Sequence, residues 1–273
     1  MKKFNVLIYV NEEKDPAHVY ESELEKVLSV HGVGYKVICE KTETDGSGYD
    51  ALFVIGGDGT ILRRTEYANR YSLPIIGINA GKLGFLSEFE PSEIESAVKA
   101  FVSGEMEKDC RATLEVVYDG KKHLGLNDAV VHRIYNDSHG MIISNTVSID
   151  GTPIGPIVGD GVIVCTPTGS TAYSLSVGGA ILAPGINAFS VTPIAAHSFS
   201  QRPVIFSAES ACAITYEGGS SAGLFIDGNL ISTLKKGERI YIRKSDRPTV
   251  FLRKKNYAFY EKLLCKLKDT AGF

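Results

Sequence analysis

An apolar run that breaks into three glycines around one carboxylate constrains the fold more than any other feature. Residues 50–55 are apolar enough for a buried strand, and residues 60–70 are expected to form a helix. Residues 56–60, Gly-Gly-Asp-Gly-Thr, are then a strand-to-helix turn. Such a turn aims backbone N–H groups at one point, and glycine lets a phosphate approach without a Cβ in the way. Either Asp58 or Thr60 merely caps the helix, or Asp58 does chemical work beside that phosphate.

The first hundred residues alternate between strands and helices. Strands are expected at residues 4–10, 35–40, 50–55 and 73–79, and helices at 15–31 and 92–104. The apolar positions of the two helices recur at helical spacing: Tyr20, Leu24, Val27, Leu28 and His31 in the first, and Ile94, Val98, Phe101 and Val102 in the second. Buried strands in this order predict a Rossmann-like, mainly parallel sheet covered by helices. Ligands of such sheets bind beyond the strand C-termini, where Gly56–Thr60 falls.

The pattern changes after about Cys110. Alternating runs at 113–118, 145–149 and 224–226 are each followed by Asp-Gly, the strongest local hairpin signal. Further strands are expected at 162–165, 203–207, 212–216 and 239–243. This half is therefore predicted to be a β-sandwich.

The last segment, 256–267, has helical spacing of its apolar residues and is expected to pack back on the first domain. Those residues are Tyr257, Tyr260, Leu263, Leu264 and Leu267. The predicted organisation is an α/β domain over 1–108, a β-rich domain over 109–250, and a returning helix over 251–273.

Composition narrows the class of protein. The net charge of −3 argues against nucleic acid or an anionic membrane as the main partner. The five cysteines have no metal-binding spacing, so we expect no metal site in the chain and interpret them as small core residues. No apolar segment reaches 18 residues, and no signal peptide precedes the first strand. We expect a cytoplasmic protein.

Two short clusters have both a functional and a structural interpretation. In Gly81-Lys82-Leu83-Gly84-Phe85-Leu86, Phe85 either offers a flat face to a base or fills the core beside a turn. The pair Asn127-Asp128 can accept from a ribose diol and donate to a base edge, or can form an ordinary turn.

A third cluster is rich in hydroxyls and small residues. Residues 166–176, Thr-Pro-Thr-Gly-Ser-Thr-Ala-Tyr-Ser-Leu-Ser, follow Gly159-Asp160-Gly161 and a short strand. They predict a surface on which a polar ligand lies close to the backbone, although a well-capped loop is the alternative. A fourth cluster, 197–203, places His197 beside Ser198, but no Gly-x-Ser-x-Gly elbow accompanies it, which favours a structural role.

These elements occur in order over nearly the whole chain, and together they resemble the bacterial NAD kinase family. The most discriminating match is the segment 166–176 followed by Gly178-Gly179; Asp227-Gly228 also fits. The resemblance implies an ATP- or polyphosphate-dependent kinase that phosphorylates the adenosine 2′-hydroxyl of NAD, with Mg²⁺ brought by ATP. It also implies a homo-oligomer, a dimer or tetramer.

The resemblance implies roles for particular residues. Asp58 would be the general base. Gly57, Gly59 and Thr60 would cradle phosphate, with Arg63 in reach of it. The β-rich domain would present the ribose to Asp58. The positions matched to the dinucleotide site of the family are Phe85, Asn127, Asp128, Asp160, Thr168, Thr171, Ala172, Tyr173, Ser174, Leu175, Ser176, Ala195 and Asn229. Asp160 in this family reaches a dinucleotide bound mainly by a neighbouring subunit.

Three positions depart from the family pattern. Val158 stands where an Arg is common, Ala196 where a Pro is frequent, and Asn229 where a Gln is frequent. Contacts to the nicotinamide half of the dinucleotide are the ones affected. The rival functions are a lipid or sugar-phosphate kinase, which would share the glycine turn, and a non-enzymatic NAD(P)-binding regulator, which would have no need of Asp58.

Overall fold

The computed structural model describes residues 3–39, 44–81, 84–134, 142–198, 200–255 and 258–271, with side chains as far as 268. The chain divides into two compact units. Unit 1 comprises Met1–Cys110 and Thr249–Phe273, and unit 2 comprises Arg111–Pro248. The predictions made for Glu40, Lys82, Leu83, Phe199, Asn256 and Tyr257 lie outside the described residues.

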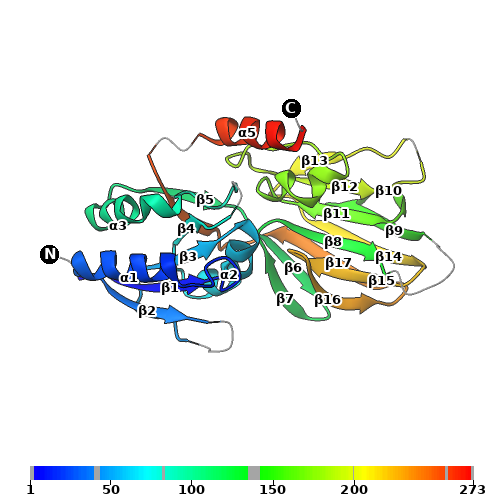
Figure 1. Cartoon of the computed structure of the whole chain (residues 1–273). Coiled ribbons are helices and arrows are strands. Elements are labelled where there is room, and N and C mark those ends of the chain that lie inside the picture. The colour runs from blue at the N-terminus through cyan, green and yellow to red at the C-terminus, as the bar shows by residue number, and fades with distance from the viewer. Residues whose placement is uncertain are drawn as a thin grey trace. The chain divides into compact units, whose positions relative to one another are not determined.

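Unit 1 is built on a six-stranded sheet with the order β2-β1-β3-β4-β18-β5 (Figure 1). The strands are β1 (Asn5–Val10), β2 (Gly34–Ile38), β3 (Ala51–Gly56), β4 (Ile75–Asn79), β5 (Glu107–Arg111) and β18 (Thr249–Arg253). The pairs β1–β2, β1–β3, β3–β4 and β4–β18 are parallel. Strands β3 and β4 are buried along their whole length, which explains their continuous apolar sequences. The predicted parallel α/β sheet is confirmed.

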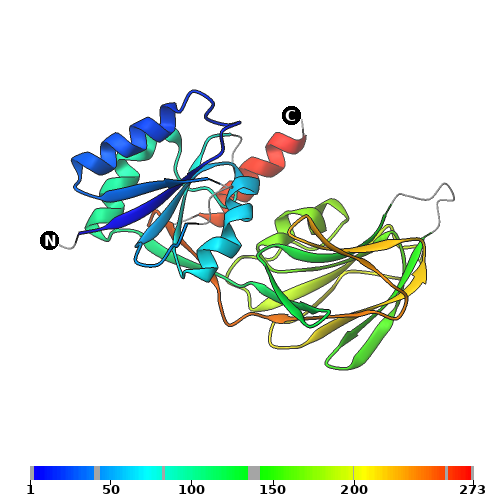
Figure 2. The same cartoon turned by 90° about the horizontal axis from the view of Figure 1, so that it is seen from below.

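Helices cover both faces of this sheet. Helices α1 (Val19–Val30) and α3 (Ile94–Ser103) pack together on one face, and α2 (Asp58–Arg70) lies on the other (Figure 2). A short 3₁₀ turn, Pro91–Glu93, precedes α3. Helix α1 starts later than predicted because the carboxylate of Asp15 accepts the backbone N–H groups of Val19 and Glu21 at its N-terminus. Helix α2 starts earlier than predicted, at Asp58 itself, so Gly59 and Thr60 belong to its first turn.

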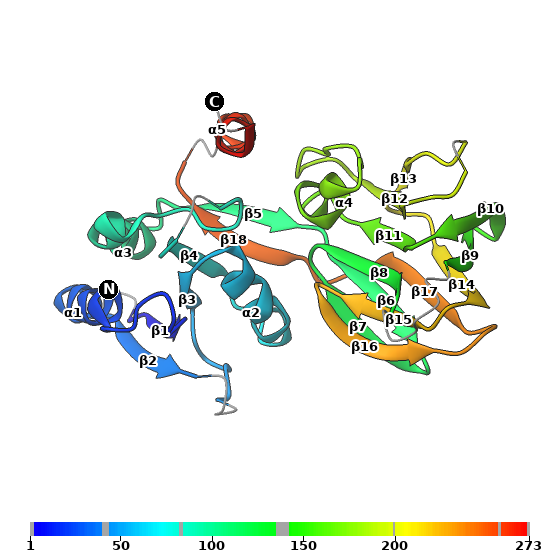
Figure 3. The same ribbon diagram turned by 45° about the vertical axis from the view of Figure 1, so that its right-hand side comes forward.

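The C-terminal segment returns to unit 1, as predicted. Strand β18 lies between β4 and β5 in the sheet (Figure 3). Helix α5 (Phe259–Ala271) then packs on the loop after β4: the Phe259 and Phe85 ring centroids are 5.9 Å apart, and Lys262 Nζ donates to the backbone oxygen of Ser87 at 2.8 Å.

Three of the apolar residues whose spacing predicted that helix are exposed rather than packed inward. Tyr260, Leu264 and Leu267 are 66%, 58% and 43% exposed. The loop that α5 covers offers carbonyl and carboxylate oxygens, so Lys262 faces it rather than the Tyr and Leu side chains.

Unit 2 is a sandwich of two six-stranded sheets whose paired strands are antiparallel. One sheet has the order β10-β9-β14-β17-β6-β7: Thr152–Gly159, Ile143–Ile149, Cys212–Gly219, Arg239–Lys244, Leu114–Tyr118 and Lys121–Gly125. The other has the order β13-β12-β11-β8-β15-β16: Val204–Ser207, Ala188–Ile194, Gly161–Cys165, Asp128–Arg133, Ala222–Ile226 and Asn229–Leu234. A 3₁₀ turn, Gly169–Thr171, and the one-turn helix α4 (Tyr173–Ser176) follow β11.

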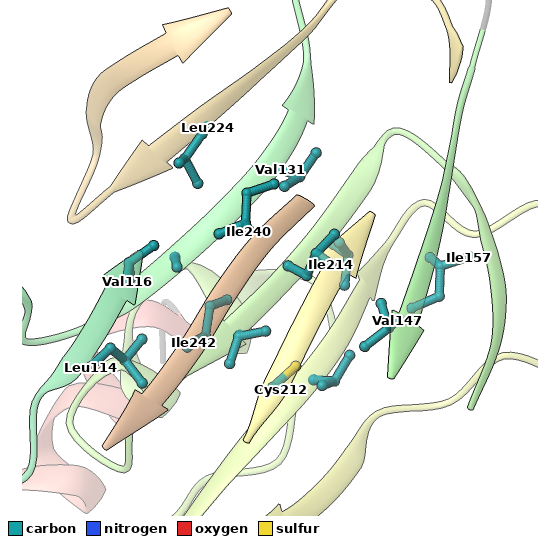
Figure 4. Close-up of a cluster of buried hydrophobic side chains, with 14 of the residues drawn as sticks. Leu114, Val116, Val131, Val147, Ile157, Cys212, Ile214, Leu224, Ile240 and Ile242 are labelled. Carbon is teal, nitrogen blue, oxygen red and sulfur yellow. The ribbon is translucent and has the colours of Figure 1, made fainter. Parts of the chain in front are cut away.

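Inward-facing side chains of both sheets form one core (Figure 4). Val116, Ile214 and Ile242 come from the first sheet, and Val131 and Leu224 from the second. The predicted β-sandwich is confirmed. All three Asp-Gly pairs occupy hairpin turns in which the aspartate has a φ of 48°, a conformation that Asp tolerates better than most residues.

The prediction that the cysteines are core residues is correct for two of the five. Cys165 and Cys212 are buried, but Cys39, Cys110 and Cys265 are exposed because they lie just after β2, on the outermost strand β5 and on the outer side of α5. Among the described residues, no helix is both long and apolar enough to cross a lipid bilayer.

Candidate functional site

The carboxylate of Asp58 is held by a row of backbone N–H groups. Phe85 N donates to Oδ2 at 2.7 Å, and Leu86 N and Ser87 N donate to Oδ1 at 3.0 and 3.4 Å. The side chain remains 31% exposed. Asp58 is also the first residue of α2, so it stands at the positive end of the helix dipole. A carboxylate has about four lone-pair sites in total, so three N–H donors leave it able to accept a hydrogen bond from a substrate group.

The glycines around Asp58 fall into two classes. A Cβ at Gly84 would lie 1.9 Å from Asp58 Oδ1, and a Cβ at Gly56 would lie 2.6 Å from the Thr60 side chain. These two glycines are therefore required by packing. A Cβ at Gly57 or Gly59 would meet no heavy atom within 4 Å. Because the protein itself does not require glycine at 57 and 59, the open space beside them is available to a ligand that approaches the backbone.

A cation from α5 faces the same carboxylate. Lys266 Nζ lies 3.9 Å from Asp58 Oδ2 and 4.9 Å from the centroid of the Phe85 ring. Phe85 is only 8% exposed and packs on Phe259, so its ring fills protein space, the second of its two interpretations. The Lys266 ammonium partly balances the negative charge that Asp58 brings to the glycine turn.

The loop that holds Asp58 is itself fastened by a buried arginine. Arg253, on β18, is 1% exposed and donates to the backbone oxygens of Phe85 at 3.2 Å and Leu86 at 3.5 Å. Its guanidinium also pairs with Glu88 at 3.2 Å and with Asp109. Lys262 adds a second cation to Glu88 at 2.9 Å, and burial lowers the pKa of this lysine. The C-terminal segment thus determines the shape of the loop that receives Asp58.

In unit 2, Asp227 holds the Asn127-Asp128 pair. Its carboxylate accepts the backbone N–H groups of Leu126 and Asn127 at 2.7 Å each, and that of Asp128 at 3.1 Å. Thr166 closes the other side, since its hydroxyl donates to the backbone oxygen of Leu126. Burial, together with the negative charge of Asp227, raises the pKa of Asp128 to about 7. Asp128 is therefore a carboxyl group that gains or loses its proton near neutral pH.

The hydroxyl-rich segment 166–176 has an inner and an outer side. Thr166, Ser170 and Ser174 are fully buried and bond within the protein; Ser174 Oγ, for example, lies 3.0 Å from Thr192 Oγ1. Thr168 is 7% exposed and accepts from Arg111 Nη1 at 3.3 Å. Many of the hydroxyls are thus used by the fold. The positions on the outer side, fully or partly exposed, are Thr171, Ala172, Tyr173, Leu175 and Ser176.

Of the remaining predicted positions, Asp160 and Ala195 lie at the start of β11 and Asn229 lies at the start of β16. Asp160 forms an ion pair with Arg133, with 3.0 Å between Oδ1 and Nε. Ala195 is exposed and has a φ of 43°, an uncommon conformation for a residue with a Cβ. The backbone oxygen of Ala195 would lie 2.7 Å from a Cβ at Gly159, so this close approach requires glycine there. Asn229 is exposed at the start of β16.

Sequence reasoning did not identify the residues that hold these sites in place. Asp227 was identified as part of a hairpin turn and of the family resemblance, but not as the carboxylate that accepts backbone N–H groups, although a carboxylate in a turn can do so. Arg253, Lys262 and Lys266 belong to no local motif, and only the tertiary fold brings them to the loop. Among the described residues, no group of three or more His, Cys, Asp or Glu side chains has the arrangement of a metal site.

Comparison with known proteins relates both units to one family. Residues 40–106 match the ATP-NAD kinase N-terminal domain, and residues 126–254 match the ATP-NAD kinase C-terminal domain. An NAD kinase of Carboxydothermus hydrogenoformans is 39% identical over 239 residues, which cover 85% of this chain and 83% of the relative. An NAD kinase of Prosthecochloris aestuarii is 35% identical over 281 residues, which cover 97% and 96%.

Two solved structures are similar along the whole chain. Yeast NADH kinase complexed with NADH has a TM-score of 0.83 and 26% identity, and the match covers 100% of this chain and 89% of the yeast chain. An NAD kinase from Archaeoglobus fulgidus in complex with ATP has a TM-score of 0.81 and 27% identity, with coverage of 97% and 99%.

Proposed function

Since the chain belongs to the NAD kinase family, we propose that it transfers the γ-phosphoryl group of ATP to the adenosine 2′-hydroxyl of NAD. The observation that supports this most is the setting of Asp58, an anchored and partly exposed carboxylate beside glycines that leave the backbone open. The ligands of the two solved relatives, NADH and ATP, are consistent with the proposed substrates.

Unit 1 supplies the phosphoryl-transfer groups in this proposal. The N–H groups of Gly57 and Gly59, at the start of α2, are proposed to bind phosphate oxygens. The N–H of Thr60 already donates to Gly57 O at 2.9 Å, so Thr60 is proposed to contact phosphate through its hydroxyl, with Arg63 one turn further along. Phosphoryl transfer depends on in-line positioning and on neutralising oxygen charge more than on covalent help from the protein. In this proposal, the glycine turn positions the phosphates and neutralises part of the charge on their oxygens.

Asp58 is proposed as the general base. The 2′-oxygen attacks the γ-phosphorus, the bond to the β–γ bridging oxygen breaks, ADP leaves, and the 2′-hydroxyl proton passes to the carboxylate of Asp58. Its three backbone N–H donors orient the carboxylate for this role. General base catalysis of this kind contributes a factor of about 10²–10⁴.

Mg²⁺ enters the proposal as part of the MgATP substrate. The described residues present one carboxylate, Asp58, at the glycine turn and no cluster fit for a resident ion. Bound to the β- and γ-phosphates, the ion would neutralise charge on their oxygens.

Unit 2 supplies the dinucleotide-binding groups in this proposal. Asn127 and Asp128 are proposed to hold ribose and base groups by hydrogen bonds, and the outer side of the segment 166–176 to line the dinucleotide. Among the outer positions, Tyr173 offers a 39% exposed ring for stacking. The proposed contacts of Thr168 and Ser174 would be indirect, through the segment that they brace.

We also infer that the chain assembles into a homo-oligomer in which Asp160 reaches a dinucleotide held by a second copy. Its pairing with Arg133 would orient the carboxylate for that contact. Sedimentation equilibrium of the wild-type chain tests the assembly. A monomer with full activity would contradict it.

The function is tested by incubating the chain with NAD, Mg²⁺ and ATP and measuring NADP with an NADP-specific cycling assay. Parallel reactions replace ATP with polyphosphate and NAD with NADH. NADP formation that requires the donor supports the proposal. Binding of NAD without turnover would favour the non-enzymatic regulator, and phosphorylation of a lipid or sugar phosphate without NADP formation would favour the rival kinases.

A further inference from the structure

The face of α5 that packs on the loop after β4 carries three residues, Phe259, Lys262 and Lys266, spaced three and four positions apart. Phe259 packs on an aromatic ring of that loop, and Lys262 donates to one of its backbone oxygens at 2.8 Å. These two contacts fix the helix on the loop. Lys266, one turn beyond Lys262, is thereby brought to the carboxylate of Asp58.

The ammonium of Lys266 stands beside the Asp58 carboxylate without being hydrogen-bonded to it. Its Nζ lies 3.9 Å from Asp58 Oδ2, whereas a charge-assisted N–H···O bond spans about 2.7–2.9 Å. Nζ also lies 4.9 Å from the centroid of the Phe85 ring, whose face attracts a cation. The Lys266 side chain is 34% exposed, and its flexible stem lets the ammonium shift toward a ligand.

Lys262, by contrast, is held firmly by the protein. Its ammonium donates to Ser87 O at 2.8 Å and to Glu88 Oε2 at 2.9 Å, and its side chain is 19% exposed. Removing this ammonium from Glu88 would leave a buried carboxylate with one cation fewer, which is costly. Of the two lysines on this face of α5, Lys266 is therefore the one that can turn to a substrate.

A phosphoryl donor beside Asp58 needs a cation at this place. The carboxylate and a polyphosphate carry charge of the same sign, so each opposes the presence of the other at the glycine turn. The N–H groups at the start of α2 supply only partial positive charges. An ammonium carries a full charge and binds phosphate oxygens as a point charge. Lys266 is placed to attract both anions and so to lower their mutual repulsion.

We propose that Lys266 is a catalytic residue whose ammonium contacts oxygens of the phosphoryl group that is transferred. When the donor binds, the ammonium shifts from its place beside Asp58 toward those oxygens and stays close to both anions. It keeps its three protons and neutralises oxygen charge, while the 2′-hydroxyl proton passes to Asp58. The inference rests on the proposed function, because it adds a residue to that same reaction.

A double-mutant cycle on MgATP binding, measured by calorimetry without NAD, tests this contact. Lys266→Met should weaken binding at least about tenfold in the wild-type chain and by a similar factor in the Asp58→Asn chain, because the lost contact is with phosphate. Lys266→Arg keeps the charge and should retain most of the affinity. Lys268→Met removes an exposed lysine of the same helix and should change nothing.

Two binding results would overturn the proposal. The first is unchanged MgATP affinity in Lys266→Met. The second is a loss of affinity that appears in the wild-type chain and vanishes in the Asp58→Asn chain, since Lys266 would then act only through the carboxylate. Melting temperatures confirm that each variant is folded, and Lys266→Gln gives the same comparison if the methionine variant is unstable.

Turnover provides the second measurement. Lys266→Met should lower kcat/KM for ATP at least about a hundredfold and leave the KM for NAD unchanged, and a folded variant with a normal kcat/KM would contradict the assignment. The two proposals fail separately. A wild-type chain that binds MgATP through Lys266 but forms no NADP would refute the proposed function alone, and NADP formation that is indifferent to Lys266 would refute this inference alone.

Discussion

The carboxylate of Asp58 accepts the backbone N–H of Phe85 across 2.7 Å, which ties the start of α2 to a loop 27 residues further along the chain. The carboxylate expected to act on a substrate therefore also shapes the protein around it. The simplest structural interpretation is that Asp58 caps its own helix. The geometry differs from this, because the backbone N–H groups that donate to its carboxylate come from the loop after β4. Changes to that loop should affect activity even where Asp58 is retained.

Replacing Gly84 by alanine should change the stability of the protein, whereas replacing Gly57 by alanine should change substrate binding. Gly84→Ala places a Cβ against Asp58 Oδ1 and should lower the free energy of unfolding of unit 1 by about 1–3 kcal/mol, as overpacking does. Gly57→Ala meets open space, and its extended backbone suits any residue, so stability should be unchanged. Gly57→Ala should instead raise the KM for ATP about tenfold, by obstructing phosphate. Thermal unfolding and steady-state kinetics of both variants check this, and the reverse assignment of the two effects would refute it.

The buried arginine of β18 should contribute far more to stability than an exposed one. Arg253→Met leaves Glu88 and Asp109 without their main cation and should cost about 3–5 kcal/mol. Arg243→Met removes a 59% exposed partner of Glu115 and should cost less than about 1 kcal/mol. Urea unfolding of the two variants gives the comparison. Equal losses would show that Arg253 does not organise the loop.

The carboxyl group of Asp128 predicts a pH dependence of stability. Its pKa is raised to about 7 in the folded chain from an ordinary value of 3.8. Between these values, unfolding releases its proton, so the free energy of unfolding should fall as the pH rises, by at most about 1.4 kcal/mol per pH unit. Above about pH 7 this contribution to the slope ends.

The variant Asp128→Asn should flatten that fall in the melting temperature between pH 4 and pH 7. Asp119→Asn is the matched control, because Asp119 is an exposed turn residue with a φ of 48° that Asn also tolerates. An unchanged slope in Asp128→Asn would mean that this carboxyl group does not retain its proton in the folded chain.

The sequence predicted the elements whose signal is local. Continuous apolar runs predicted β3 and β4, and Asp-Gly pairs predicted the hairpins of unit 2. It did not predict that residues 249–253 pair with β4, because a short apolar strand has the same pattern in either unit. The exposure of Tyr260 and Leu264 on α5 was not predicted, for a related reason. The surface that α5 covers is a polar loop, so a lysine packs against it instead of these two side chains.

The site was predictable as a set of motifs but not as a set of contacts. The glycine turn and the segment 166–176 were recognisable from residue type and order. Some hydroxyls of that segment, such as that of Ser174, form hydrogen bonds within the fold. Their partners lie on strands distant in sequence, so the segment alone does not identify them. The same holds for Asp227, whose carboxylate binds backbone that precedes it by about a hundred residues.

The central claim, that Asp58 takes the proton of the NAD 2′-hydroxyl during phosphoryl transfer, is tested most directly by the turnover of Asp58→Asn with NAD and MgATP. NAD binding is measured by calorimetry on the same variant, and Gly84→Ala serves as the control for a disturbed loop that retains the carboxylate. The account predicts a fall in kcat of at least about a hundredfold with NAD affinity nearly unchanged. Near-normal NADP formation by Asp58→Asn would contradict it.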